Sequence, residues 1–472
     1  MLTTTVETIL SVTGGTLYQG SPDAVGNDVA TDSRRVTPGC IFVALSGEHV
    51  DGHEFLEGAI AAGARVLIVS RDREDPAVAR GTALAEQHRD VAVVHVEDGT
   101  SAIQALATYH RSRLTCAVVG VTGSTGKTTT KDFLDAVLRS TLNVVSTQEN
   151  QNNELGVPLT VLRAGADTDV LVVEMGMRGL GQIEELCAIA RPTVALVTNV
   201  GVTHIEILGS QDAVASAKGE LVRALGPEGV AFLNGDDAYS AAIAATSLAP
   251  VIYYGLSDTC SLCADNVEVD AESRAAFDLR SDVGTAHITL PIPGRHNVYN
   301  ALAAAAVGLY LGVPLDRVVR ALDTAEVSAM RMELFTSADG VTVINDAYNA
   351  NPVSMQAAVV TLAEMDSATR RVAVLGDMAE LGSLTELAHF RIGELVARLP
   401  IDVLVVVGPR AVHIAHGARA EGMSAERIYE CSTVEEASGV LRRTLRHNDA
   451  VLVKASRVMG LESIVEEIVS PA

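Results

Sequence analysis

Short apolar runs recur along the whole chain, and stretches with helical periodicity lie between them. In the middle of the chain these runs are Ala117–Val121, Val144–Ser146, Val170–Glu174, Val194–Asn199, Val230–Leu233 and Val251–Tyr254. Strands that alternate with helices in this way form a parallel sheet covered by helices on both faces. We therefore predict an α/β protein whose ligands lie beyond the carboxyl ends of its strands.

The same alternation divides the chain into three units, which we place at residues 1–107, 108–325 and 326–472. The first unit contains the runs Ile41–Leu45, Ala64–Val69 and Val91–Val96, and the third contains Val341–Ile344, Arg371–Leu375, Val403–Val407 and Ala450–Val453. Alternating polarity over Val267–Pro291 predicts antiparallel strands late in the middle unit. The third unit looks Rossmann-like but lacks the G-x-G-x-x-G pattern, so we expect no dinucleotide there.

The segment Thr122-Gly-Ser-Thr-Gly-Lys-Thr128 follows the first apolar run of the middle unit and opens a helix predicted over 129–138. Glycines let backbone N–H groups approach phosphate oxygens, and the helix N-terminus adds positive potential. Lys127 can reach the β- and γ-phosphates, and the Thr128 hydroxyl can bind Mg²⁺. Val121 occupies a position where the general P-loop pattern has glycine. The alternative is a plain strand-to-helix turn with an exposed lysine.

Polar residues follow the neighbouring strands of this unit. Glu174 ends an apolar strand where P-loop proteins usually place an Asp that holds Mg²⁺, although a solvent-facing Glu would look the same. His204 follows the next strand and is either structural or a metal ligand. Lys218 lies in a predicted helix, where a lysine is most often a solvated surface residue.

Two further segments have two interpretations each. The loop with Asn150, Asn152 and Asn153 is rich in amides, which suit polar ligands but also cap helices and form turns. The loops around 30–53 have the composition of a small-ligand site, and equally of ordinary turns around Asp and Gly. The segment 294–300 precedes an apolar helix that extends to Val313 and caps it in our prediction.

Composition narrows the function further. A net charge of −24 argues against a general nucleic-acid or anionic-membrane surface, and the absence of Trp with 3% aromatics argues against stacking platforms for single strands. The first residues have no signal-peptide pattern, and the longest apolar run, Ala301–Val313, is too short to span a bilayer. Six scattered cysteines suit reduced thiols, so we expect a cytoplasmic protein. Cys260 and Cys263 have no second ligand pair nearby, so we do not expect zinc.

Several segments in this order resemble the Mur ligase family over nearly the whole chain. They are Thr31–Arg34, Thr122–Thr128, Asn150–Asn153 with Gly156–Pro158, Asp346–Pro352 and Leu375–Gly382. The resemblance implies three α/β domains and an ATP-dependent ligase that works through an acyl phosphate. Within the family, these segments resemble the branch that joins D-alanyl-D-alanine to UDP-N-acetylmuramoyl-tripeptide in peptidoglycan precursor synthesis. One departure is Ala455, where the family pattern has glycine.

The resemblance also implies roles for single residues, carried over position by position. Ser33, Arg34 and the loop of Gly47 would contact the uridine nucleotide, and Asn150, Asn152 and Asn153 would line the path of the muramoyl-peptide. The ATP site would comprise Thr122, Gly123, Ser124, Thr125, Gly126, Lys127, Thr128 and Thr129, with Asn297 and Asn300 near adenine, and Arg331, Asp346 and Asn349 coming from the third unit to the γ-phosphate and ribose.

The same resemblance implies Mg²⁺, with two ions, held by Thr128, Glu174, His204 and Lys218. Lys218 would be a carbamate that bridges the ions, because carbamylation turns a cation into an anion that a metal attracts. The catalytic set would be Lys127, Glu174, His204, Lys218 and Arg331. We expect a monomer that acts on small molecules, with no nucleic-acid partner and no membrane span.

Three alternatives stay open at this point. One is another Mur-type ligase that adds a different amino acid, or one that acts on folate. A second is a P-loop ATPase switch whose end domains bind protein partners. A third is a uridine-nucleotide binding protein without catalytic activity, which the Gly-Lys-Thr segment and Glu174 count against.

Overall fold

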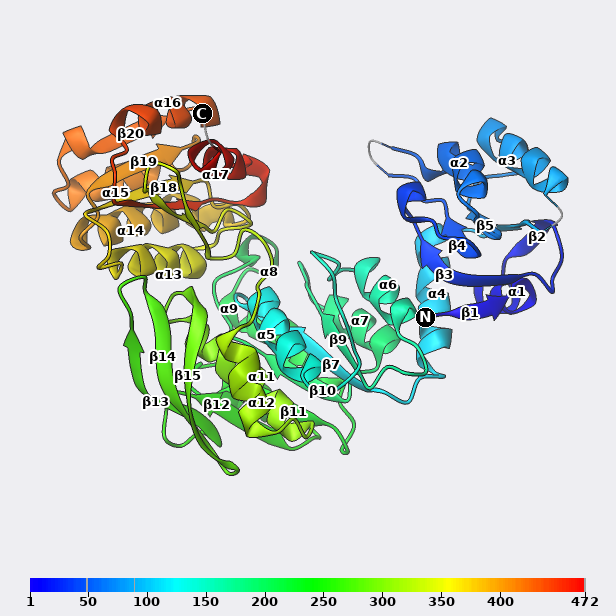
Figure 1. The fold of residues 1–472 in the computed structure, drawn as a ribbon. Coiled ribbons are helices and arrows are strands. Elements are labelled where there is room, and N and C mark those ends of the chain that lie inside the picture. Colours follow the sequence, from blue (N-terminus) through cyan, green and yellow to red (C-terminus); the bar gives the residue numbers. More distant parts are fainter. Residues whose placement is uncertain (48–49, 89, 471–472) are drawn as a thin grey trace.

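The computed structural model describes residues 1–47, 50–88 and 90–470, and the strands within these ranges form three sheets (Figure 1). Each sheet belongs to one continuous part of the chain, and Figure 1 shows the middle part between the other two. The α/β fold class predicted from the sequence is therefore confirmed. No helix of the described residues has both the length and the apolar composition needed to cross a bilayer.

The first sheet has six strands in the order β1-β3-β4-β5-β6-β2. Their bounds are β1 (Thr3–Thr5), β2 (Thr16–Gln19), β3 (Val25–Ala30), β4 (Cys40–Val43), β5 (Val66–Val69) and β6 (Ala92–His95). The helices are α1 (Val6–Thr13), α2 (Leu56–Ala61), α3 (Pro76–Gln87) and α4 (Gly99–Arg111). Strands β3 to β6 are parallel, whereas β1 and β2 pair antiparallel at the two edges. The sequence pattern missed β1, β2 and β3, which carry many polar residues.

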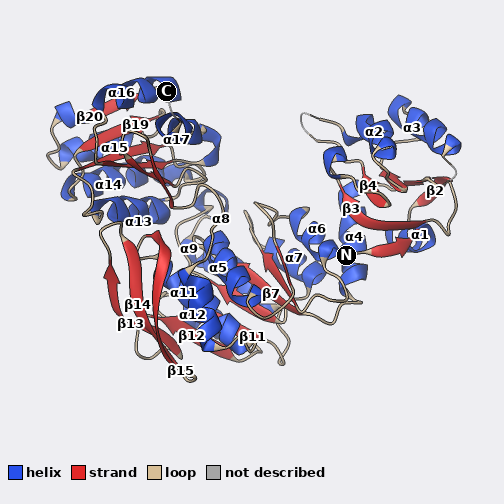
Figure 2. Cartoon of the chain, in the orientation of Figure 1, coloured by secondary structure: helices blue, strands red, loops and turns tan. Residues whose placement is uncertain are grey.

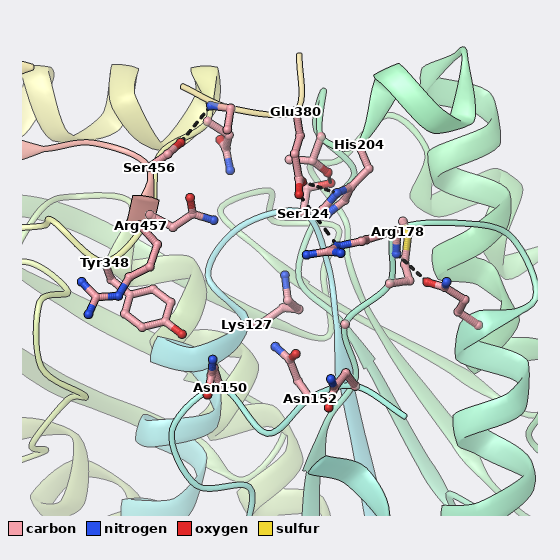
Figure 3. Close-up of a pocket in the computed structure, with 18 of the residues that line it drawn as sticks. Ser124, Lys127, Asn150, Asn152, Arg178, His204, Tyr348, Glu380, Ser456 and Arg457 are labelled. Atoms are coloured by element: carbon pink, nitrogen blue, oxygen red, sulfur yellow. Dashed lines mark hydrogen bonds and ion pairs between the residues drawn. The ribbon is translucent and has the colours of Figure 1, made fainter. Parts of the chain in front are cut away.

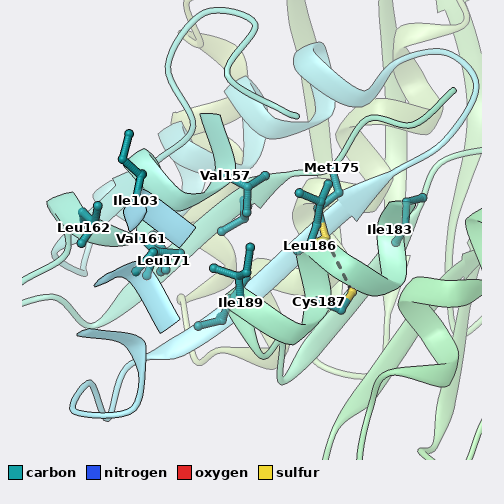
Figure 4. Packing of buried hydrophobic residues seen from close by; sticks show 14 of the residues in the cluster. Ile103, Val157, Val161, Leu162, Leu171, Met175, Ile183, Leu186, Cys187 and Ile189 are labelled. Atoms are coloured by element: carbon teal, nitrogen blue, oxygen red, sulfur yellow. Dashed lines mark hydrogen bonds between the residues drawn. The ribbon is translucent and has the colours of Figure 1, made fainter. Parts of the chain in front are cut away.

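Helix α4 joins the first unit to the middle one. Its buried Ile103 lies in the same apolar cluster as Val157 and Leu162 of the middle unit (Figure 4). The guanidinium of Arg111 donates from Nε to the Ala190 carbonyl over 2.8 Å. The boundary predicted at residue 107 therefore falls inside a helix whose apolar face packs on both units.

The middle sheet has nine strands in the order β15-β14-β13-β12-β11-β10-β7-β9-β8. Their bounds are β7 (Ala117–Thr122), β8 (Val144–Ser146), β9 (Val170–Glu174), β10 (Val194–Val197), β11 (Val230–Asn234), β12 (Val251–Gly255), β13 (Leu262–Val269), β14 (Arg274–Ser281) and β15 (Gly284–Pro293). In the order of the sheet, the seven strands from β8 to β13, which include β7, are parallel. Strands β13, β14 and β15 form the predicted antiparallel end. Strand β7 lies between β9 and β10, so three strand ends meet beside the P-loop.

Helices cover both faces of the middle sheet, as Figure 2 shows. Their bounds are α5 (Lys127–Arg139), α6 (Gly156–Arg163), α7 (Gln182–Ala190), α8 (Ile205–Leu208), α9 (Gln211–Arg223), α10 (Ser240–Ala244), α11 (Asn297–Tyr310) and α12 (Leu315–Asp323). Helices α5, α11 and α12 share one apolar cluster with the sheet, and α6, α7 and α9 share the other. Helix α11 is buried along almost its whole length, as its apolar sequence predicts. It has no side-chain cap at His296, which corrects our capping prediction.

The third sheet has six strands in the order β16-β17-β21-β18-β19-β20. Their bounds are β16 (Glu333–Thr336), β17 (Thr342–Asn345), β18 (Arg370–Gly376), β19 (Val403–Val407), β20 (Ile428–Cys431) and β21 (Asp449–Lys454). The helices are α13 (Pro352–Ala363), α14 (Thr385–Arg398), α15 (Val412–Ala420), α16 (Val434–Thr444) and α17 (Glu462–Val469). The pattern missed the edge strands β16 and β20. Apolar clusters lie on both faces, as a doubly covered sheet requires.

Candidate nucleotide and metal site

Two glycines of the P-loop occupy positions that only glycine fits. Gly123 has a φ of 150°, and a β-carbon there would come within 1.8 Å of Thr198 Oγ1. Gly126 has a φ of 77°, and a β-carbon there would come within 2.4 Å of Asn300 Oδ1. Since both the backbone conformation and the close neighbours exclude a side chain, these glycines let the loop turn sharply into the N-terminus of α5.

The residues that follow β10 brace this loop, and sequence reasoning missed their role. Asn199 Oδ1 accepts the Thr125 N–H over 3.0 Å, and Asn199 Nδ2 donates to Thr125 Oγ1 over 2.8 Å. Thr198 Oγ1 donates to the Thr125 carbonyl over 2.6 Å, and the Gly201 N–H donates to Ser124 Oγ over 2.8 Å. The only sequence signal was polar residues directly after a strand next to the P-loop strand.

The carboxylate of Glu174 is buried at the end of β9, beside the P-loop strand. Glu174 is 1% exposed. Strand β9 pairs with β7, and Glu174 lies opposite Val121 in that pairing. Oε1 accepts from Asn152 Nδ2 over 2.9 Å, whereas Oε2 has no hydrogen-bond partner among the described residues. A buried oxygen with no partner carries a large desolvation cost, which a bound cation would offset.

The charges of Glu174 and Arg331 act on the Lys127 side chain. Burial lowers the pKa of Lys127, while the charge of Glu174 raises it and the charge of Arg331 lowers it. Lys127 Nζ donates to the Gly123 carbonyl over 2.8 Å, so the side chain curls back over its own loop. The guanidinium of Arg331 lies 4.3 Å from the ring centre of Tyr348. Arg331 of the third unit is therefore close enough for its charge to act on Lys127 of the P-loop.

The sequence pattern had indicated that Lys218 is a solvated surface lysine, and the structure contradicts this interpretation. It is 2% exposed and lies on α9, and its ammonium makes no hydrogen bond to any residue in the described ranges. Burial lowers its pKa well below the usual range, and the charge of Lys127 lowers it further. The pattern failed because α9 packs against the sheet, and its Lys218 lines the cleft instead of facing bulk solvent. Burial therefore disfavours the charged form of this amine.

His204 precedes α8 with a left-handed backbone, at φ 54°. Its Nδ1 lies 2.8 Å from Glu380 Oε2 of the third unit, although its N–H direction falls outside hydrogen-bond geometry. Arg178 Nε lies 3.8 Å from the other oxygen of Glu380. The contact with His204 lowers the pKa of Glu380, and the charge of Arg178 acts in the same direction. The sequence did not predict this contact between the two units.

A polar cleft of about 700 Å³ separates the middle unit from the third (Figure 3). Eight residues predicted for the site line it: Ser124, Lys127, Asn150, Asn152, Asn153, His204, Lys218 and Asn349. The third unit contributes a wall that the prediction did not include, with Tyr348, Glu380, Ser456 and Arg457. The P-loop, the amide-rich loop and two of the proposed metal ligands thus share one cavity.

Several predicted residues have side chains that hydrogen-bond or pair inside the protein. Asn300 Oδ1 accepts from Thr130 Oγ1 over 3.1 Å, and Asn297 Nδ2 donates to the Pro293 carbonyl over 2.8 Å. Asp346 pairs with the buried Lys454 over 2.5 Å. Asn153 Oδ1 accepts the Gly156 N–H over 2.9 Å at the start of α6, which is the capping role that the sequence left open. The ligand contacts implied for these residues stay predictions.

The residues predicted for the uridine nucleotide lie on the first unit, away from the cleft lining. Ser33 and Arg34 belong to a 3₁₀ turn (Ser33–Arg35), and the Arg34 side chain is 86% exposed beside Asp32. Hydrogen bonds from Arg34 lower the pKa of Asp32 to about 2. The Gly47 N–H donates to the Val50 carbonyl over 3.0 Å. Glu48 and His49 of the same loop lie outside the described residues.

The proposed metal ligands fit a magnesium site only as a mixed set. Within the described ranges, no three His, Cys, Asp or Glu side chains come together as a cluster. The proposed set therefore supplies the hydroxyl of Thr128, the carboxylate of Glu174 and the imidazole of His204. Lys218 adds a fourth ligand, which would be the second anionic one, only if it is carbamylated. Magnesium prefers oxygen ligands and keeps several waters or phosphate oxygens, which suits such an open set. The unpartnered Glu174 Oε2 is the observation that favours the fit.

A braced P-loop at the head of a parallel sheet, facing another α/β unit across a polar cleft, defines an enzyme that uses a nucleoside triphosphate. The Mur ligase middle domain matches residues 121–308, the Mur ligase glutamate ligase domain matches 330–457, and the Mur ligase family catalytic domain matches 27–111. The chain belongs to the Mur ligase family. The predicted class, an ATP-dependent ligase, is thereby confirmed.

Individual relatives match over the full length. A UDP-N-acetylmuramoyl-tripeptide--D-alanyl-D-alanine ligase from Mycobacterium tuberculosis (strain ATCC 25618 / H37Rv) is 40% identical over 503 residues, which cover 100% of this chain and 98% of that protein. A crystal structure of MurF from Acinetobacter baumannii superposes with a TM-score of 0.86 at 30% identity, covering 99% of both chains. MurF ligase from Thermotoga maritima, in complex with ADP, superposes with a TM-score of 0.78 at 26% identity, covering 94% and 97%.

Proposed function

We propose that this protein joins D-alanyl-D-alanine to a UDP-N-acetylmuramoyl-tripeptide, using ATP, in the synthesis of peptidoglycan precursors. The observation that carries the proposal is the full-length match to a ligase of that name, at 40% identity over 100% of this chain. The cleft supports it, because the P-loop lies on one wall and a second unit supplies Arg331 and the opposite wall. A switch that binds protein partners would not need such a cavity between two units.

In the proposed reaction, a carboxylate oxygen of the tripeptide attacks the γ-phosphorus of ATP, and ADP leaves. The amine of D-alanyl-D-alanine then attacks the acyl carbon, loses a proton, and phosphate leaves. The first step brings anions together, and the cations Lys127 and Arg331 stabilise the charge that spreads over the transferring phosphoryl group. A docked third unit also limits water, which would otherwise hydrolyse the acyl phosphate.

For the metal, we propose that Thr128, Glu174, His204 and Lys218 hold Mg²⁺, with two ions, and that Lys218 is carbamylated. Bound Mg²⁺ would neutralise part of the phosphate charge. Asn152 orients the Glu174 carboxylate by its hydrogen bond. The lowered pKa of the Lys218 amine supports carbamylation, since only a neutral amine adds to carbon dioxide.

Further parts of the proposal concern binding and location. Ser33, Arg34 and Gly47 contact the uridine nucleotide, and Asn150, Asn152 and Asn153 line the peptide path. We keep the domains at 1–107, 108–325 and 326–472, with the first border inside α4. The six cysteines are buried and unpaired, which supports a reducing compartment such as the cytoplasm. A monomer is expected, and light scattering would test it.

A phosphate-release assay tests the proposed function. The purified protein with ATP and Mg²⁺ receives the UDP-tripeptide that ends in diaminopimelate, or the one that ends in lysine. D-alanyl-D-alanine, D-alanine, D-glutamate or no acceptor is added to each. We expect release that requires both a UDP-tripeptide and D-alanyl-D-alanine. Equal release with a single amino acid would favour another ligase of the family, and equal release with ATP alone would favour an ATPase switch.

A further inference from the structure

The carboxylate of Glu380 crosses from the third unit to the middle unit and contacts His204 (Figure 3). We propose that Glu380 is a positioning residue for His204, and that it sets the metal-binding form of the imidazole only while the third unit is docked. The inference rests on the metal role proposed above for His204. The new element is Glu380. Through this residue, docking of the third unit and metal binding would depend on each other.

The side of the ring that Glu380 contacts determines which nitrogen stays free. A carboxylate only accepts hydrogen bonds, so Glu380 Oε2, 2.8 Å from Nδ1, favours the form of the imidazole that has its proton on Nδ1. Nε2 then keeps its lone pair, and it makes no hydrogen bond to any residue in the described part of the chain. Histidines that bind metals usually donate their second N–H to a carboxylate, which sets both tautomer and ring orientation. In the structure the Nδ1–H direction lies outside hydrogen-bond geometry, and the observation is the close contact of 2.8 Å between Nδ1 and Oε2.

The backbone around this contact is strained on both sides. His204 has φ 54° and Glu380 has φ 60°, a left-handed conformation that is uncommon for residues other than glycine. Such strain persists where surrounding structure enforces it, and it concentrates at functional sites. The two backbones also approach closely, because a β-carbon on Gly382 would stand 3.1 Å from Glu206 Cβ. The contact is therefore a tightly packed junction, and Arg178 braces the second carboxylate oxygen.

Two further contacts between these units join residues that do not line the cleft. The Ser367 N–H donates to the Ala271 carbonyl over 3.0 Å, and Ser273 Oγ donates to Glu364 over 3.4 Å. Glu380, in contrast, lines the cleft together with His204. Through this contact, docking of the third unit changes a proposed metal ligand. Because coupling between two binding events is reciprocal, metal binding must in turn favour docking.

Manganese binding by the full-length protein tests the inference. Mn²⁺ is titrated by electron paramagnetic resonance into wild type, Glu380→Ala, Glu380→Gln and Glu386→Ala, where Glu386 is an exposed glutamate of the same unit. We expect Glu380→Ala to weaken Mn²⁺ affinity by about 10- to 100-fold. Glu380→Gln should weaken it less, because the amide oxygen still accepts the Nδ1–H. Glu386→Ala should bind like wild type.

Small-angle scattering gives a second readout, the change in compactness of the protein when Mn²⁺ is added. A merely structural role of Glu380 would not alter this change. Added Mn²⁺ should make wild type more compact and leave Glu380→Ala unchanged. Two further variants, Glu174→Gln and His204→Ala, test the metal site separately from the role of Glu380. Both should lose Mn²⁺ affinity. If they lose it while both Glu380 variants bind like wild type, the role of Glu380 is wrong and the metal site stands. If His204→Ala binds Mn²⁺ like wild type, the metal role of His204 is wrong and the inference falls with it.

Discussion

Asn152 holds one oxygen of Glu174 and leaves the other free. Its Nδ2 donates to Oε1 over 2.9 Å, and Oε2 is buried without a hydrogen-bond partner among the described residues. The amide-rich loop therefore fixes the orientation of the carboxylate, and the free oxygen is the one that we propose as a metal ligand. This pair connects the amide-rich loop with the strand end at Glu174, and the sequence had left two interpretations open for each of them.

Glu174→Gln should raise the Mg²⁺ concentration needed for half-maximal rate and lower kcat by about 10- to 100-fold, because a neutral amide is a poorer ligand than a carboxylate. Asn152→Ala should act in the same direction and more weakly, since it releases the orientation of Oε1. Initial rates against Mg²⁺ concentration measure both. Gln151→Ala is the control on the same loop. An unchanged Mg²⁺ dependence in Glu174→Gln would remove Glu174 from the metal site.

Lys127→Ala should lower kcat by about 1,000-fold or more, because the cation that stabilises the transferring phosphoryl group is lost. The fold should survive, since among the described residues the Lys127 ammonium makes one hydrogen bond, to its own loop. Phosphate release and circular dichroism measure the two effects. Arg139→Ala, on the exposed far end of α5, serves as the control. Full activity in Lys127→Ala would contradict the P-loop mechanism.

Lys218→Ala should be nearly inactive and should regain part of its activity with added acetate or formate, because a small carboxylate can replace a carbamate. Lys218→Met should unfold at a higher temperature than wild type when carbon dioxide is excluded, since a buried amine loses its hydration. Phosphate release with and without acetate measures the first effect. Wild-type activity in Lys218→Ala without any addition would show that the lysine has no catalytic role.

The stability of the protein should fall with pH below about 6.5, in part through His296. Burial lowers the pKa of His296 from 6.5 to about 4, with Asp346 raising it and Lys454 lowering it. The unfolded state therefore binds a proton that the folded state rejects, so stability is complete above pH 6.5 and is lost as pH falls towards about 4. The loss is at most about 3 kcal/mol. Urea unfolding of His296→Gln should show a smaller loss over the same range, and an identical loss would assign it to other groups.

Asn199→Ala should raise the KM for ATP by about 10-fold, because the P-loop loses hydrogen bonds that hold Thr125 and each such bond contributes about 1 kcal/mol. The effect on kcat should be smaller, since Lys127 and Glu174 are untouched. Steady-state kinetics with varied ATP separates the two constants. Asn266→Ala, on the surface of the antiparallel strands, is the control. A change confined to kcat would indicate that Asn199 acts on the chemical step instead.

The sequence pattern predicted the strands that lie in the middle of the parallel sheets. Strands β7, β9, β10 and β19 are buried on both faces, so each is an unbroken apolar run that stands out in the sequence. Of the missed strands, β1, β2, β16 and β20 lie at sheet edges, where one side faces solvent and polar residues are tolerated, and β3 lies next to the edge strand β1. The P-loop was predictable because phosphate binding demands glycines and a lysine at a local spacing.

The sequence by itself determined the α/β fold class, the P-loop and the family, because these depend on local patterns and on several motifs in one order. Only the tertiary structure decided that Lys218 is buried, that Asn199 braces the P-loop and that Glu380 contacts His204. The physical reason is distance along the chain. Burial and charge at the site depend on side chains that lie tens to hundreds of residues apart, and only the packing of three sheets brings them together.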